Sequence, residues 1–581
     1  MPGSTAIILS DIGTGGSGQK ISRLLKFFGV GHQVVAVDEL FPLLLKKDTG
    51  PVQIFGSAAA FLRLFEKLEK ERDKQWLLDA RIHSAFCFVE NGGGNPAGIL
   101  AKLSVGTKAK LVAAKESSEP WKVSETAKDF TGLLTGLTVA PVAAASGLGP
   151  AGLVRGLHTE TLIANPEGAV FLRLTFSGRP FFLSMTDVID IDAPLPARDF
   201  DIRPHFLQAV PVVLYVKWAF AGTGWQSSET TACLVIDDPL LRPKYGHLNY
   251  EHLLGLMERL NFSTSIAFIP WNWNRSSAGT VKLFKDKQAR FSLSVHGCDH
   301  TAGEFGGRDR ARLAWKSRES IRRMARHRQK TGLAHDQVMI FPQGVFSGEA
   351  MAAVKHGEFI GTVSSEVISA DPPARPVTIA DYWEVAVMNY SDFPIFTRRY
   401  PWAGAENFAF DILLGKPCIV AIHHNDCHDG YKCLSDCIER LNKLNVKLRW
   451  TSLAEVIRRS FRWREISPSV VELEMYGSEV RLFNPSGEKK VFRICKREST
   501  ADAITGITVE SQPVKWVFAD NQVTFETDLF PEEAKTVTIT YKPIPLDGIA
   551  GEGLGYRIKA GMRRYLSEVR DNHFQQKMFS K

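Results

Sequence analysis

Short apolar runs alternate with helical patterns over residues 1–205 of the chain. Ala6–Leu9, His32–Val37 and Ala85–Val89 predict strands, and Lys20–Phe28 and Phe61–Lys70 predict helices between them. Strands that alternate with helices are typical of a layered domain with a parallel sheet. We therefore expect a flavodoxin- or Rossmann-like α/β domain, closed at its far edge by an antiparallel hairpin.

A second alternating block follows an apolar helix that is predicted near residues 206–222. Its predicted strands are Thr231–Ile236, Ser263–Phe268, Phe291–Val295, Gln337–Phe341, Phe359–Val363, Val385–Met388, Cys418–Ile422 and Val446–Trp450. Helical patterns, the longest at Arg308–Gln329, separate many of these strands. Repeated β/α units of this length are typical of a (β/α) barrel, here an incomplete one.

The pattern changes again after about Pro468. Short strands with turns between them predict a small β-sandwich, and Ile558–Val569 predicts a basic amphipathic helix in the C-terminal tail. The expected division is an α/β domain at 1–205, a barrel at 206–465, a sandwich at 466–545 and a helical tail at 546–581.

Composition narrows the class of protein. Of the 581 residues, 44% are hydrophobic and 23% are charged, the balance of a folded globular chain. The net charge of +8 is spread out, and its densest basic stretch, Arg308–Lys330, alternates with apolar residues as a solvated helix face does. This distribution does not favour nucleic acid as a partner. The eight cysteines form no CxxC pair, which disfavours a structural zinc site.

The chain shows no targeting or membrane-spanning pattern. Its first residues, MPGSTAIILSDIG, predict a strand rather than a signal peptide. The longest apolar stretch, Phe206–Ala221, contains Pro211 and Lys217 and is too short to span a bilayer. We expect a cytoplasmic protein without a membrane span, with export by another route left open.

Three chemically active motifs follow predicted barrel strands. They are Asp237-Asp238, the segment His296-Gly-Cys-Asp-His300, and His423-His424. The carboxyl ends of barrel strands meet at one face, where such barrels build active sites. Carboxylates and spaced histidines can hold a divalent ion and move protons to and from reactants. The sequence therefore predicts a hydrolytic metal site, and a polar rim without an ion is the alternative.

These motifs, in this order, resemble the polysaccharide deacetylases of the NodB homology or carbohydrate esterase family 4 type, over about residues 228–460. The resemblance implies an incomplete barrel of the NodB type. It also implies that Asp238, His296 and His300 bind the metal, most naturally zinc, with cobalt or nickel as alternatives. Asp237 would be the catalytic base, and His424, or else His423, the catalytic acid.

Two positions depart from the family pattern. Gly297 stands where the second motif has Ser or Thr. Ile340 stands where the third motif, Arg-x-Pro-aromatic-Gly, has the arginine that orients the base, although Pro342 and Gly344 are kept. Three loop arginines could replace it: Arg242, Arg275 and Arg375. A degenerate, non-catalytic barrel is the competing reading.

Aromatic and polar loop residues suggest a groove for a sugar-like substrate. The expected substrate-binding residues are Trp271, Asn272, Trp273, Tyr245 and Trp383. Indole faces stack on flat ligands, although aromatic residues packed over a barrel rim would show the same pattern. Asp426 and His428 could orient His424 as neighbours of the metal site.

The first domain carries two weaker motifs. Gly13–Gly18 matches GxGxxG, with Asp38 twenty residues after it, as in dinucleotide-binding folds, but a flexible turn is the favoured interpretation. Glu90–Asn95 resembles the elbow of glutamine-amidotransferase-like domains, but no cysteine stands at the turn because Cys87 lies within the strand. We expect a non-catalytic relative that lacks the nucleophile.

The resulting hypothesis is a metal-dependent hydrolase that removes acetyl groups from an N- or O-acetylated carbohydrate. Two alternatives stay open: a non-catalytic carbohydrate-binding or scaffold protein, and an amidohydrolase that acts on a non-sugar amide.

Overall fold

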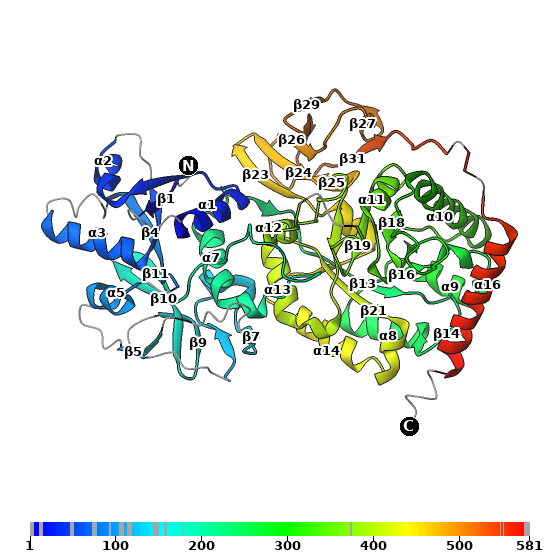
Figure 1. The fold of residues 1–581 in the computed structure, drawn as a ribbon, viewed down its shortest axis with the longest axis horizontal. Coiled ribbons are helices and arrows are strands. Elements are labelled where there is room, and N and C mark those ends of the chain that lie inside the picture. Colours follow the sequence, from blue (N-terminus) through cyan, green and yellow to red (C-terminus); the bar gives the residue numbers. More distant parts are fainter. Residues whose placement is uncertain are drawn as a thin grey trace. The chain divides into compact units, whose positions relative to one another are not determined.

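The computed structural model divides into two compact units (Figure 1). The first comprises Met1–Ala193 and Asp201–Gln226, and the second comprises Pro194–Phe200 and Ser227–Lys581. The residues described are 5–10, 16–46, 51–71, 78, 80–91, 94–103, 110–112, 119–142, 150, 152–155, 160–176, 178–371, 375–546, 548–549 and 551–574.

The first unit is built on one sheet in the order β2-β1-β3-β4-β11-β10-β9-β6-β7, in which β8 also pairs with β10 and β5 pairs with β8. From β2 to β11 neighbouring strands are parallel, and from β11 to β7 they are antiparallel. The predicted hairpin is confirmed by the pairing of β10 with β11. The strands are β1 (Thr5–Ser10), β2 (His32–Ala36), β3 (Val52–Ser57), β4 (Ile82–Phe88), β5 (Lys110–Val112), β6 (Trp121–Val123), β7 (Thr138–Val139), β8 (Leu153–Arg155), β9 (Glu160–Asn165), β10 (Gly168–Phe176) and β11 (Arg179–Ser184).

The helices of this unit include α7 (Phe206–Ala219), which is apolar on all sides and largely buried. A helix of this composition is stable only inside a core. It belongs to the first unit, although the sequence assigned it to the start of the barrel domain. The other helices are α1 (Ser17–Phe27), α2 (Leu40–Leu44), α3 (Ala58–Lys70), α5 (Pro96–Leu103) and α6 (Lys128–Thr131).

The two motifs predicted in the first unit fall partly outside the described residues. Residues 13–15 of the GxGxxG segment and residues 92–93 of the predicted elbow are not described. The Asp38 carboxylate forms an ion pair with Arg63 at 2.6 Å, and Cys87 is buried in β4. Nucleotide binding and the amidotransferase-like elbow therefore stay predictions.

Parallel strands form the barrel sheet of the second unit, in the order β20-β19-β18-β17-β16-β13-β21. β22 pairs with the beginning of β13. The strands are β13 (Thr231–Asp237), β16 (Thr264–Phe268), β17 (Phe291–His296), β18 (Val338–Ile340), β19 (Gly361–Ser364), β20 (Ile395–Thr397), β21 (Cys418–His423) and β22 (Arg449–Trp450). Their carboxyl ends lie at one face, as the parallel order requires.

The chain directly after β20 connects the two edges of this curled sheet. Arg399 forms a parallel bridge with Val420 of β21, through backbone hydrogen bonds of 3.0 and 2.8 Å. Because side chains alternate along an extended chain, Arg398 and Arg399 point in opposite directions. Arg399 pairs with Asp411 of α13 (Ala405–Leu414), so Arg398 faces the interior of the barrel.

Helices cover the barrel, and the long predicted helix is confirmed as α10 (Arg310–Thr331). The prediction of a strand at Val385–Met388 is wrong, because the strand in this part of the chain is β20, at Ile395–Thr397. Val385–Met388 is an apolar loop buried in the core, and a short buried run has no periodicity that separates the two cases. The other helices are α8 (Tyr250–Leu260), α9 (Ala278–Asp286), α11 (Gly348–Lys355), α12 (Ile379–Trp383), α14 (Lys432–Asn442) and α15 (Leu453–Arg458).

Two sheets follow the barrel and share one apolar core, which includes Leu473, Leu482 and Ile494. One has the order β23-β24-β26-β30-β29, and the other has the order β25-β31-β27-β28. Their strands are β23 (Arg462–Ser467), β24 (Val470–Met475), β25 (Glu479–Phe483), β26 (Lys490–Arg497), β27 (Ile504–Val509), β28 (Gln512–Pro513), β29 (Val517–Ala519), β30 (Gln522–Leu529) and β31 (Ala534–Tyr541).

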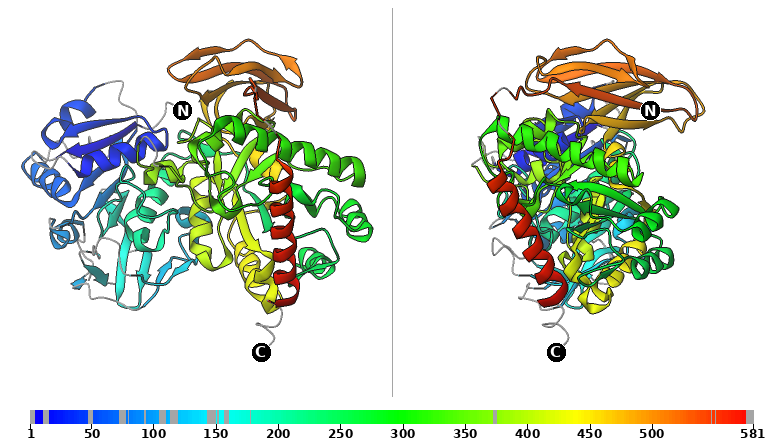
Figure 2. Two further views of the ribbon diagram at one scale, coloured as in Figure 1. Left: turned by 45° about the vertical axis from the view of Figure 1, so that its right-hand side comes forward. Right: turned by 90° about the vertical axis from the view of Figure 1, so that its right-hand side faces the viewer.

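The C-terminal helix α16 (Leu554–Val569) runs along the outside of the second unit, and the short segment η9 (Arg570–Phe574) continues it (Figure 2). Glu568 near the end of α16, and Asp571 and Asn572 of η9, contact residues that follow β13. No helix in the described part of the chain is both long and apolar enough to cross a membrane.

Candidate metal centre

The predicted site residues converge because their strands are neighbours in a parallel sheet. Asp237 ends β13 and lies opposite His423, which ends the adjacent strand β21. His296 ends β17, two strands away on the other side. The carboxyl ends of parallel strands share one edge, so residues far apart in sequence lie together there.

Asp238 is the centre of the cluster. Its Oδ1 atom lies 3.2 Å from Nε2 of His296 and 3.0 Å from Nε2 of His300. This oxygen is buried, and no hydrogen-bond donor among the described residues serves it. Asp238 also has a φ of 80°, a backbone conformation that side chains other than glycine seldom adopt. Such strain persists where the surrounding structure enforces it, often at functional sites.

The hydrogen bond of His296 leaves its Nε2 atom unprotonated and able to bind a metal ion. Nδ1 of His296 lies 3.1 Å from the carbonyl oxygen of Ile340, so its proton is donated there. The Nε2 atom then keeps its lone pair, and it faces Asp238. The Nε2 atoms of both imidazoles lie about 3 Å from one carboxylate oxygen, close to the roughly 3.4 Å that separates ligand atoms around tetrahedral zinc, and all three ligand atoms lie within 4.8 Å of one another. The donor set fits a divalent ion.

The loop that presents His300 is organised by Glu304. The carboxylate of Glu304 accepts the backbone N–H groups of Cys298, Asp299 and His300, at 3.1, 2.7 and 3.0 Å. His300 has a φ of 57° in this loop. The three bonds hold the backbone in the turn that directs the imidazole towards Asp238.

Gly297 is required by the same turn. Its φ is +61°, and an added Cβ atom would lie 2.4 Å from Cγ of Pro342 and 2.6 Å from Oε2 of Glu304. A serine or threonine, the residues expected here from the family pattern, does not fit this backbone. The backbone of this loop therefore requires a glycine at position 297.

The arginine that supports Asp237 is Arg398. Its two terminal nitrogens donate to the two carboxylate oxygens of Asp237, at 2.7 and 2.6 Å, and Nε donates to Ser365 at 3.2 Å. Burial alone would raise the pKa of Asp237, but the positive charge of Arg398 holds it below its usual value. The bidentate pair fixes the orientation of the carboxylate and keeps it ionised.

The three arginines considered from the sequence have other partners, which corrects that expectation. Arg375 forms a bidentate pair with Asp381 at 2.8 Å, and Arg242 and Arg275 both pair with Glu568. Ile340, at the motif position, is fully buried in the barrel core. The sequence held a signal for Arg398, which directly follows the short apolar strand β20, but that strand was predicted elsewhere.

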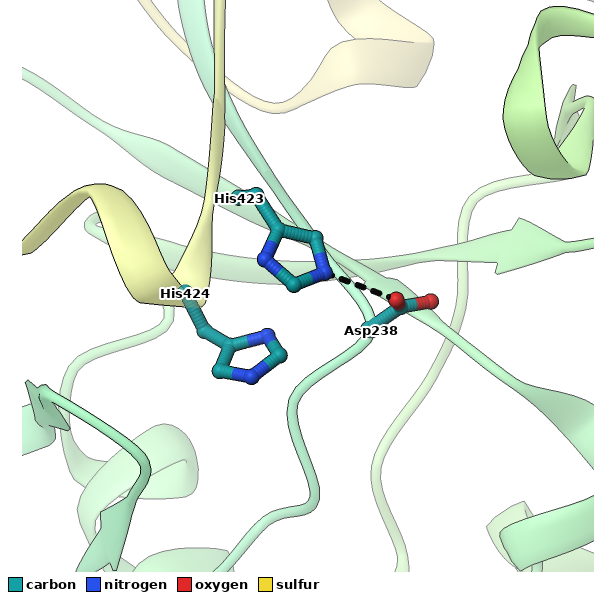
Figure 3. Close-up of side chains that lie close together, drawn as sticks. All are labelled: Asp238, His423 and His424. Atoms are coloured by element: carbon teal, nitrogen blue, oxygen red, sulfur yellow. Dashed lines mark hydrogen bonds and ion pairs between the residues drawn. The ribbon is translucent and has the colours of Figure 1, made fainter. Parts of the chain in front are cut away.

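His423 and His424 have different environments (Figure 3). Nε2 of His423 lies 2.9 Å from Oδ2 of Asp238, and its Nδ1 accepts a hydrogen bond from the backbone of Asn425. Nε2 therefore carries the proton and donates it to Asp238. Burial alone would lower the pKa of His423, but the hydrogen bond and the charge of Asp238 raise it.

His424 is fully buried, and no hydrogen bond or ion pair joins it to Asp238 in Figure 3, although one of its ring nitrogens lies within 4.8 Å of an Asp238 carboxylate oxygen. Its Nδ1 atom lies 3.4 Å from the carbonyl oxygen of Asp237, and its Nε2 atom lies 3.5 Å from a carboxylate oxygen of Asp571. Burial lowers the pKa of His424. Asp426 accepts the backbone N–H of His423 at 2.7 Å, and His428 lies against the carbonyl of Asn425, so the neighbours expected to orient His424 bind elsewhere in this turn.

The predicted substrate-binding residues are only partly accessible to a ligand. Trp271 and Trp273 are half-buried, and arginines of α10 lie over their rings, at 5.0 and 5.7 Å from the ring centres. Asn272 is buried. Tyr245 packs edge-on against His424 at 4.8 Å, and its hydroxyl lies 3.4 Å from Asp571.

Trp383 does not line a groove, which corrects the prediction made for it. It is fully buried and packs edge-on against Phe200 and Phe410. Its place directly after Asp381 and Tyr382 suggested a pocket wall, but α12 turns this indole into the core. Asp381 itself caps the helix through Thr378 and pairs with Arg375.

No protein-family model matches the sequence, and no curated protein matches it. Among solved structures, the chain is similar to the CE4 domain of a xylanase from a termite hindgut metagenome, with 12% identity over 39% of this chain and 90% of that one, at a TM-score of 0.25. It is also similar to a family 4 carbohydrate esterase from Streptomyces lividans, bound to acetate, with 11% identity over 39% of this chain and 94% of that one, at a TM-score of 0.25.

A family 4 acetyl xylan esterase from Clostridium thermocellum, bound to a cobalt ion, gives 12% identity over 39% of this chain and 90% of that one, also at a TM-score of 0.25. Scores of this size do not assign the chain to a family. The functional assignment below therefore depends on the residues of the site.

Proposed function

We propose that this protein is a metal-dependent hydrolase that removes acetyl groups from an acetylated carbohydrate. The observation that carries the proposal is the environment of Asp238 Oδ1, which is buried, lacks a hydrogen-bond donor and faces the Nε2 atoms of His296 and His300. The carbohydrate substrate follows from the resemblance of the motifs to those of the polysaccharide deacetylases.

Asp238, His296 and His300 would hold the ion. A divalent ion bound there supplies Lewis acidity to the carbonyl of the acetyl group. Asp237, ionised and oriented by Arg398, lies next to this position and would take the proton from the attacking water. The rigid bidentate pair keeps the base at a fixed distance from the reacting atoms.

Of the two candidate acids, the contacts favour His423. Its Nε2 atom carries a proton and points to the centre of the cluster. A group of this kind can donate a proton to the leaving oxygen or nitrogen. His424 is fully buried, faces Asp571 and would hold the turn after β21 in position.

Release of acetate from a panel of N- and O-acetylated sugars tests this function. The full chain, freed of metal by a chelator, should be inactive and should regain activity with Zn²⁺ or Co²⁺. His296→Ala should stay inactive after metal is added, and His252→Ala, which changes an exposed histidine of α8, should behave as the wild type. Metal-independent acetate release, or full activity of His296→Ala, would rule out the proposal.

A further inference from the structure

Helix α16 has two opposite faces that repeat every four residues. The inner face consists of Tyr556, Ala560, Arg564 and Glu568, and the outer face consists of Leu554, Ile558, Met562 and Leu566. Successive residues of an α-helix are about 100° apart, so two series offset by two residues lie on opposite sides. The polar members belong mainly to the inner series and the apolar members to the outer one.

The inner face is held against the barrel by polar contacts. The hydroxyl of Tyr556 lies 3.0 Å from Oδ2 of Asp299. Glu568 forms ion pairs with Arg242, at 2.8 Å, and with Arg275. Ala560 and Arg564 are buried. The orientation of the helix is therefore fixed by charges and hydrogen bonds at several points along its length.

The outer face is exposed although it is apolar. Leu554, Ile558, Met562 and Leu566 are 74%, 55%, 61% and 62% exposed, and Tyr565 beside them is 65% exposed. A helix on the surface of a globular protein normally turns its apolar stripe to the core. A contiguous exposed apolar stripe of this kind marks a binding surface.

The charges of the helix are divided in the same way. Arg557 and Lys559 are exposed beside the apolar stripe, and Arg570 is exposed beyond its end. Glu568 is the one acidic residue of Leu554–Val569, and it is turned inward and paired. The outer face therefore presents apolar and basic side chains without an acidic one.

We propose that the outer face of α16 docks on an anionic phospholipid membrane, with the helix lying in the plane of the surface. An apolar stripe flanked by Arg and Lys is the pattern of interfacial helices, in which the apolar side chains enter the boundary of the acyl chains. The basic residues meet the negative headgroups, and a tyrosine suits this interface. The docked segment continues into η9, which contacts His424 through Asp571.

A second copy of the chain is a poorer occupant of this surface. A symmetric pairing of the outer face with itself would bring two rows of Arg557, Lys559 and Arg563 together without an acidic partner on either helix. Like charges placed opposite each other in an interface oppose association. An anionic surface satisfies both the apolar and the basic residues.

Vesicle flotation with the full chain tests the proposal. We expect binding to vesicles of 70% phosphatidylcholine and 30% phosphatidylserine, and at least about tenfold weaker binding to pure phosphatidylcholine or at 0.5 M salt, because screening shortens the reach of the charges. The variant Ile558→Gln/Met562→Gln/Leu566→Gln should lose this binding. Arg557→Gln/Lys559→Gln should weaken it by about 30-fold, since each basic residue near the surface contributes about 1 kcal/mol.

The matched control is Val517→Gln/Phe530→Gln, which removes two exposed apolar residues of the β-rich region and should bind as the wild type does. Zn²⁺ binding of every variant shows that the barrel is folded and separates this proposal from the proposed hydrolase. No binding of the wild type to anionic vesicles would overturn the proposal. A wild-type dimer that the triple variant converts to a monomer, without vesicle binding, would also overturn it.

Discussion

Two clusters of acidic residues lie one loop apart at the carboxyl end of the barrel, and their partners differ in charge. The Asp238 cluster consists of Asp238, His296, His300, His423 and His424. The Asp299 cluster consists of Asp299, Glu304, Lys316 and Arg323. The first surrounds a carboxylate with imidazole nitrogens, and the second surrounds two carboxylates with permanent cations.

The difference shows why only one of them suits a metal ion. Lys316 lies 3.2 Å from Asp299 and 3.1 Å from Glu304, and Arg323 also pairs with Asp299. Burial would raise the pKa of Asp299, but Arg323 and Lys316 lower it to about 2. Its charge is already neutralised by side chains. At Asp238 the Oδ1 atom faces the Nε2 atoms of two imidazoles instead of permanent cations, and imidazole nitrogens can bind a metal ion together with a carboxylate.

The largest expected effect concerns the base beside the Asp238 cluster. Asp237→Asn should lower kcat by roughly 10²–10⁴-fold, the usual contribution of a general base, and leave Zn²⁺ affinity within about threefold of the wild type. Steady-state acetate release with metal in excess measures the first value, and calorimetry measures the second. Asp286→Asn, at an exposed site on α9, is the control. Unchanged kcat in Asp237→Asn would remove that residue from the mechanism.

The next effect concerns stability in the Asp299 cluster. Arg323→Met should lower the free energy of unfolding by about 3–5 kcal/mol, because Asp299 and Glu319 keep buried charges after a partner is removed. Arg322→Met, one residue earlier and exposed, should change it by about 0.5 kcal/mol at most. Urea unfolding followed by tryptophan fluorescence measures both. Equal effects of the two substitutions would contradict the contrast between the clusters.

The smallest effect concerns Gly297, which lies in the chain between His296 of the Asp238 cluster and Asp299 of the other cluster. Gly297→Ala should destabilise the protein by about 1–3 kcal/mol, because its φ is positive and Pro342 occupies the space of a Cβ atom. Gly255→Ala, inside α8 with no neighbour around the added carbon, should stabilise it by about 1 kcal/mol. Opposite signs in thermal unfolding are expected. A stabilising Gly297→Ala would show that the loop is not held as described.

The sequence was sufficient for residues that stand directly after their strands. Asp237, Asp238 and His296 were predicted from contiguous motifs, and the parallel order of β13, β16 and β17 brings these residues to one edge. Arg398 was not found, because its position depends on β20 and on the bridge of Arg399 with β21. Closure of a sheet between its two edges leaves no periodic signal in the sequence.

The environment of side chains was harder to predict than their position in the chain. Trp383, beside Asp381, was predicted from the sequence to line a pocket, but helix α12 directs its side chain into the core. His423 and His424 are adjacent in sequence and differ only through contacts with Asp238 and Asp571, of which Asp571 lies in the C-terminal segment. Contacts between segments that distant require the folded structure.

Calorimetric titration of the full chain with Zn²⁺ tests the central claim most directly, with Asp238→Asn and Asp299→Asn beside the wild type. The wild type and Asp299→Asn should each bind about one ion per chain. Asp238→Asn should bind more than about 100-fold more weakly, beyond the 10–100-fold cost of losing a residue that only supports a ligand. A wild type without stoichiometric metal, or an Asp238→Asn variant with wild-type affinity, would contradict the assignment of this cluster as a metal centre.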